Sequence, residues 1–214
     1  MSDIQTQLMG FIVKNVEKSF FNGIRDKIYI QYGIAEDFLT EHFQLTPKGR
    51  LRPQMCRYLT DEALAEVGGE LRYTNPRGEH YLVADTGSVV ISHLAVKDGK
   101  TQKEAVHRKL LSLGNKILEP FQPDMFKSDI EDLREKLHVV IYVIQPNSAS
   151  KQQGVPEGIF IAVPFSDWTD YHAWLSIDEM LSMYESEEIL ESDGAWPKLK
   201  IALRDRESKQ GNSE

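Results

Sequence analysis

The sequence predicts an α+β protein in which N-terminal helices are followed by a small antiparallel or mixed sheet with flanking helices. Three observations lead to this class. Apolar residues recur at helical spacing from Ile4 to Phe20. Strand-forming runs separated by Asp and Gly turns begin at His80. Helix-capping patterns then alternate with further strand-forming runs in the second half of the chain.

Composition sets the expected organisation. The 214 residues are 41% hydrophobic, which is enough to bury a core. We expect a helical region over residues 1–69, an α+β sheet domain over 70–204 and a disordered tail over 205–214, which also fit within one compact domain. No apolar run has membrane-spanning length and the N-terminus lacks a secretory pattern, so a cytoplasmic protein without membrane contact is expected.

The helical region is expected to contain three segments. The first helix should end at Asn22-Gly23, and a β-prone run, KIYIQY, follows at Lys27–Tyr32. A second helix is predicted from Ile34 to about Gln44, and the Pro and Gly residues of 45–53 then predict an exposed basic loop. Thr60 should cap a short helix that Gly68-Gly69 closes.

The sheet region begins with a predicted hairpin. Two strand-forming runs, Tyr81–Ala84 and Ser88–Val96, flank an Asp85–Gly87 turn. His138–Gln145 is apolar on both faces, which is typical of a central strand. Gly158–Val163 is its predicted partner, across a polar loop that we expect to be mobile.

Three capping boxes predict the remaining helices. They are Thr101 with Glu104, Ser128 with Glu131, and Ser176 with Glu179. The first opens a helix whose core stripe is Val106, Leu110, Leu113 and Ile117, and the third opens an acidic helix to about Leu190. A further strand is considered at Lys198–Leu203.

Charge is unevenly distributed along the chain. The net charge is −8, yet Phe165–Pro197 holds nine acidic residues and no Lys or Arg. Gln44–Thr60 holds four basic residues and no acid. This bipolar pattern favours an intracellular interaction or regulatory protein that contacts a protein or a nucleic acid through its charged surface. Solvated surface charge is the simpler alternative, and the pI of about 5.3 argues against non-specific DNA coating.

A phosphate-binding surface is the more specific form of this hypothesis. Its candidate residues are basic and fall into two groups that would need to meet in space. They are Lys48, Arg50, Arg52, Arg57, Lys103, Arg108 and Lys109.

A metal-dependent nuclease is the alternative. Asp85, followed at a distance by Asp98 and Lys100, resembles the nuclease arrangement in which two carboxylates hold Mg²⁺ and a lysine steadies the reacting groups, with Glu79 as a third ligand. Both aspartates also suit turns, and a continuous strand between them would separate the two carboxylates by about 30 Å. No cofactor is expected unless this alternative holds.

Other chemistry receives little support from the sequence. The common nucleotide-loop, zinc-protease, dithiol and serine-hydrolase motifs are absent. The single cysteine, Cys56, suits packing better than nucleophilic catalysis. His93 and His138 fall in predicted strands and suit satisfied sheet positions. His80 beside Glu79 is a weak acid-base or phosphate-binding candidate.

Overall fold

The computed structural model describes residues 3–44, 48–75, 78–97, 105–119, 136–147 and 149–185. Its helices are α1 (Asp3–Asn15), α2 (Lys18–His42), α3 (Lys48–Glu66), α4 (Val106–Leu111) and α5 (Ile177–Met183), with a 3-10 helix η1 (Ser112–Leu118). Its strands are β1 (Glu70–Tyr73), β2 (His80–Asp85), β3 (Val89–Val96), β4 (Leu137–Ile144), β5 (Gly158–Pro164) and β6 (Tyr171–Ser176). Helices precede a mixed sheet, so the predicted α+β class is confirmed.

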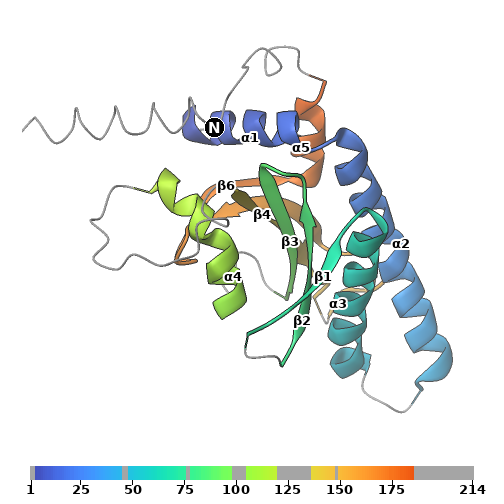
Figure 1. Cartoon of the computed structure of the whole chain (residues 1–214). Helices are drawn as coiled ribbons and strands as arrows, with labels where there is room; N and C mark the ends of the chain where they lie inside the picture. Colours follow the sequence, from blue (N-terminus) through green and yellow to red (C-terminus); the bar gives the residue numbers. More distant parts are fainter. Residues whose placement is uncertain are drawn as a thin grey trace, which may run out of the picture.

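The six strands form one sheet in the order β1-β2-β3-β4-β5-β6. Neighbouring strands are antiparallel except β3 and β4, which are parallel from the pair Val89↔Leu137 to the pair Val96↔Ile144. Parallel neighbours require a crossover, and this one contains α4 and η1. Figure 1 shows α4 on one side of the sheet and the α2–α3 pair on the other.

Strand β4 is buried on both faces of the sheet. Its alternate residues Val139 and Ile141 join a large core with the N-terminal helices, whereas Val140 and Tyr142 join a second cluster on the opposite face. This two-sided burial explains the unbroken apolar run and confirms the predicted central strand. Its predicted partner is confirmed as β5.

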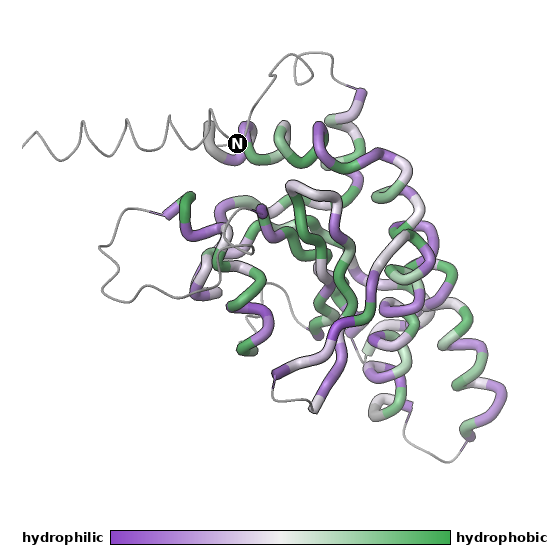
Figure 2. Tube along the Cα trace, in the orientation of Figure 1, coloured by the Kyte–Doolittle hydropathy of each residue, from purple (hydrophilic) through white to green (hydrophobic). Residues whose placement is uncertain are grey.

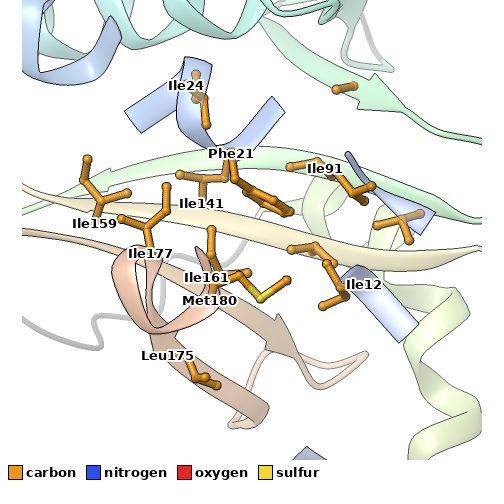
Figure 3. Packing of buried hydrophobic residues seen from close by; sticks show 14 of the residues in the cluster. Ile12, Phe21, Ile24, Ile91, Ile141, Ile159, Ile161, Leu175, Ile177 and Met180 are labelled. Carbon is orange, nitrogen blue, oxygen red and sulfur yellow. The ribbon is translucent and has the colours of Figure 1, made fainter. Parts of the chain in front are cut away.

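The large core lies between the sheet and helices α1, α2, α3 and α5. Figure 3 shows Ile12 and Phe21 from the N-terminal helices against Ile141 and Ile161 of the sheet, with Met180 of α5 beside them. Figure 2 shows by residue hydropathy that the middle of the sheet is apolar, whereas the β1–β2 pair is largely polar. Helices and sheet therefore share one hydrophobic core. None of the described helices has the length and apolarity needed to cross a membrane.

The strand predicted at Lys27–Tyr32 is wrong. The first helix ends at Asn15, and α2 then runs without a break through Asn22-Gly23 and the KIYIQY segment. Ile24, Ile28 and Tyr32 continue one buried stripe at helical spacing. Burial of this stripe against the sheet outweighs the β propensity of the segment.

The exposed basic loop predicted at 45–53 is also wrong from Lys48 onward, since α3 begins there. Pro53 lies inside α3, which extends through the segment where Thr60 was expected to act as a cap. Thr60 is instead buried, and its hydroxyl donates a hydrogen bond to the Cys56 carbonyl. The predicted stop is confirmed, because Gly68 has a φ of 104° just after the helix.

Further details confirm or correct the predicted elements. The Asp85–Gly87 hairpin turn and the Ser176–Glu179 capping box are both present. The described part of α4 begins at Val106. Val106 is 70% exposed, so its predicted place in the core stripe of this helix is wrong. The sequence did not predict strands β1 and β6. The Thr101 and Ser128 capping boxes, the Lys198–Leu203 strand and the 205–214 tail lie outside the described residues.

We expect Gly69→Ala to destabilise the protein by about 1–3 kcal/mol, because an alanine Cβ would lie 2.8 Å from the Leu64 carbonyl oxygen. The control is Gly33→Ala in α2, where a Cβ meets no atom within 4 Å. That variant should gain about 0.5–1 kcal/mol from helix propensity. Urea unfolding measures both, and equal effects would contradict the close approach at Gly69.

Candidate functional site

The sheet divides between β2 and β3. These strands pair only beside their turn, at Ala84↔Ile91 and Asp85↔Val90. The other half of β2 pairs with β1, as in Tyr81↔Arg72, while β3 continues along β4. We call the resulting gap between the two strands the fork. Figure 1 shows the β1–β2 pair leaving the sheet between α3 and α4.

A water-sized cavity of about 30 Å³ lies in the fork. Its lining combines polar and charged side chains from two strands and two helices. The lining residues are Arg57, Asp61, Tyr81, Leu82, Ser92, His93, His107, Arg108 and Leu111. Helix α3 therefore reaches the fork from one face of the sheet and α4 from the other.

A buried acid and histidine pair lies inside the fork. His93 Nε2 on β3 is 2.5 Å from Asp61 Oδ1 on α3, and their side chains are 7% and 9% exposed. The other polar atoms of the pair, His93 Nδ1 and Asp61 Oδ2, are buried without a hydrogen bond. The pair joins α3 to β3 inside the protein.

Two arginines from different helices lie at this cavity. Arg57 of α3 is 44% exposed at its side chain, and its guanidinium is 3.7 Å from the Glu79 carboxylate. Arg108 of α4 is more enclosed, and burial lowers its pKa, with a smaller contribution from the positive charge of Arg57. Burial and the nearby Arg108 also lower the pKa of His107. The lowered pKa favours the neutral form of His107 at pH 7.

Each arginine is next in the chain to a ring that stacks on another ring. Tyr58 stacks on His80 with their centroids 6.4 Å apart, and Tyr81 stacks on His107 at 4.5 Å. Tyr58 is 48% exposed. We define the fork surface as Arg57, Tyr58, His80, Tyr81, His107 and Arg108.

A fully hydrogen-bonded histidine supports the fork from the second face of the sheet. The buried His138 ring bonds to Ser92 Oγ at 2.9 Å and to Ser112 Oγ at 2.7 Å, and the Trp168 indole donates to the same Ser112 oxygen. Burial lowers the pKa of His138 to about 3, with smaller contributions from the charge of Arg108 and, once it is protonated in acid, from His107. His138 therefore has the satisfied structural position that the sequence suggested.

The nuclease candidates do not meet within the described residues. Asp85 accepts hydrogen bonds from Gly87 N in the hairpin turn and from Lys136 Nζ, and these lower its pKa although burial acts in the opposite direction. Asp98 and Lys100 lie outside the described residues, and β3 runs unbroken over Val89–Val96 before them. Glu79 is at the mouth of the fork instead, facing Arg57.

The predicted phosphate-binding residues separate into distinct places. Arg57 and Arg108 meet at the fork. Lys48 donates to Thr40 Oγ1, and Arg52 forms an ion pair with Glu36. Lys109 lies near Asp167, whose pKa is lowered mainly by Thr169 hydrogen bonds. Lys103 and the Arg50 side chain are not among the described parts.

Ion pairs also reduce the charge separation that the sequence suggested. Arg25 and Lys18 of α2 pair with Asp178 and Glu185 of the acidic segment. On the basic segment, Arg52 and Arg57 both have acidic neighbours. Where the structure describes both partners, opposite charges are therefore intermingled, and the fork is the more specific feature.

The described residues do not form a metal site or a reactive-cysteine site. No group of three side chains suited to binding a metal occurs there. Cys56 is buried, and burial raises its pKa to about 11, so the thiol is protonated at neutral pH and suits packing.

Sequence reasoning missed Asp61 and its pairing with His93. Arg57 and Asp61 are four residues apart on a helix, a spacing that places them on the same face and is the available signal. The Pro and Gly residues of 45–53 and the capping preference of Thr60 obscure this signal, because they favour a loop and a later helix start. No family model, curated protein or solved structure gives a significant match to this chain.

We expect acid to destabilise the fold below about pH 6.5 through two buried histidines. Burial lowers the pKa of His138 to about 3 and that of His172 to about 4. In the unfolded chain each histidine binds a proton near pH 6.5, whereas in the folded protein it stays neutral until its lowered pKa is reached. The free energy of unfolding therefore decreases, as the pH falls below about 6.5, by up to about 1.4 kcal/mol per pH unit for each histidine.

Urea unfolding between pH 7 and pH 5 measures this slope. His138→Gln should remove about half of it, since glutamine does not titrate, whatever its effect on stability at pH 7. A variant that keeps the full slope would show that His138 is not one of the responsible groups.

Proposed function

We propose that this protein binds single-stranded nucleic acid on the fork surface. The observation that carries the proposal is the convergence of Arg57 and Arg108, from two helices, at one cavity, with a stacked ring pair that includes the chain neighbour of each arginine, Tyr58 and His107. Exposed aromatic rings beside cationic groups are the elements that single-strand binding uses. The proposal narrows the interaction function expected from the sequence to one surface and one class of partner.

The charges of the fork surface suit phosphate. A guanidinium presents paired donors that match phosphate oxygens, and two of them here come from opposite sides of the fork. The Arg57 contact with Glu79 is between exposed side chains, so a phosphate can compete with it at little cost. The Asp61 carboxyl group is buried against His93, so it is not presented to a phosphate at the surface.

The rings favour single strands over duplex. The fork cavity is about 30 Å³, which is too small for a base, so bases would lie on the outer rings. Tyr58 offers an accessible face next to Arg57, and a base stacked on such a ring contributes about 1–3 kcal/mol. Bases that are paired and stacked in a duplex cannot use this face.

Fluorescence anisotropy with labelled single-stranded and duplex oligonucleotides tests the proposal. We expect Arg57→Ala to weaken single-strand binding about 5–10-fold and to reduce the slope of log affinity against log salt by about one phosphate contact. Tyr58→Ala should weaken single-strand binding at least about 5-fold and affect duplex binding less.

Arg25→Ala is the matched control, because Arg25 is an arginine of α2 that pairs with Asp26 and Asp178 and does not line the fork cavity. Equal losses for Arg25→Ala and Arg57→Ala would refute a specific site. An absence of binding at low salt would favour a protein partner. Cleavage of the oligonucleotide in Mg²⁺ that disappears in Asp98→Ala would favour the nuclease alternative.

A further inference from the structure

A larger cavity, of about 330 Å³, lies away from the fork. Its lining comes from the first turns of α3, from the residues that directly follow β3 and β4, and from the loop after β4. The lining residues are Gly49, Arg52, Pro53, Cys56, Lys97, Gln145, Pro146, Asn147 and Gln153. The cavity therefore opens at the carboxyl ends of the two parallel strands, where α/β sheets commonly bind ligands. Its volume is within the range of small-molecule sites.

The walls of this cavity are held in place by hydrogen bonds. Gln145 Nε2 donates to the Pro53 carbonyl, which links the end of β4 to α3. Gln153 Nε2 donates to the carbonyls of Asn147 and Ser150, which closes the loop after β4 on itself. The described loop thus has a defined shape, and a ligand would enter a largely formed site.

Two cationic side chains line the cavity. Lys97 is exposed and makes no ion pair within the described residues. Arg52 directs Nε and Nη2 to one Glu36 oxygen, which fixes its guanidinium at the wall. The Glu36 carboxylate balances Arg52, so the Lys97 charge is left for an anionic ligand.

The remaining lining suits a planar polar group. Three amide side chains, those of Gln145, Asn147 and Gln153, line the cavity. Gln153 uses both of its N–H groups within the loop and offers only its oxygen, whereas Gln145 uses one of its two N–H groups. Asparagine and glutamine amides match the hydrogen-bonding edge of a purine. Pro53 and Pro146 supply apolar surface against which a flat ring can pack.

From this arrangement we propose that the cavity is a binding site for a small organic phosphate of mononucleotide size. Its phosphate would lie by Lys97 and Arg52, and its ring would lie among the amides and prolines. The site is independent of the fork surface, because the two cavities share no lining residue.

Isothermal titration calorimetry with adenosine 5′-monophosphate tests this proposal on the full chain, with adenosine and inorganic phosphate as separate probes. We expect the nucleotide to bind, adenosine to bind at least about 10-fold more weakly, and inorganic phosphate to compete. Lys97→Ala should weaken nucleotide binding at least about 10-fold, because it removes a charge-assisted contact. Lys151→Ala is the matched control, an exposed lysine of the same loop that is not in the lining.

Gly49→Leu provides a second variant that fills the cavity. A Cβ at Gly49 meets no atom within 4 Å, and leucine favours a helix more than glycine does, so the fold should not lose stability. Nucleotide binding should be lost while the melting temperature of the free protein is kept. Arg57→Ala should leave nucleotide binding unchanged, which separates this site from the fork surface.

Three results would overturn the proposal. They are an absence of nucleotide binding at millimolar concentration, equal affinity for adenosine and its monophosphate, and nucleotide binding that survives both Lys97→Ala and Gly49→Leu.

Discussion

The burial of β4 on both faces constrains the rest of this fold. A strand that is apolar on each side needs cover above and below, and its parallel neighbour β3 needs a crossover to reach it. The crossover contains α4 and η1, Trp168 packs in the cluster on one face of β4, and the N-terminal helices cover the other face. Asn115 fixes this crossover, since its amide bonds to the backbone of His138 and of Pro164.

The two candidate sites lie at different places along β3: Ser92 and His93 in the middle of the strand line the fork cavity, and Lys97 just after its end lines the second cavity. At the fork, β3 loses β2 as a neighbour, and the gap admits side chains from helices on both faces of the sheet. Beyond Val96 the strand ends beside β4, and the second cavity is lined by the residues that follow. Both places are discontinuities in an otherwise regular sheet, where backbone and side-chain groups are available to other molecules.

Local patterns in the sequence were sufficient for several elements. The Asp85–Gly87 turn, the apolar run of β4 and the Ser176 capping box each depend on neighbouring residues, and each is present. Predictions failed where a local preference competed with burial. The KIYIQY segment has strand-forming residues, but its Ile28 and Tyr32 also continue a helical stripe that the sheet covers.

The candidate site was predictable only in part. The sequence placed Arg57 and Arg108 in one proposed phosphate-binding surface but did not connect Glu79 or His80 with it, and it linked Asp85 to a nuclease pattern instead of to Lys136. Asp61 and His93 are 32 residues apart, so no local pattern could pair them.

The sequence by itself determined the class, the central strand, the turns and the capped helix, because short-range stereochemistry and hydrophobic period encode them. Only the tertiary structure decided which charges meet. Charges that are segregated along the chain become neighbours once helices pack on the sheet, as Arg25 and Asp178 do. The extent of β2–β3 pairing, which creates the fork, likewise depends on contacts between distant segments.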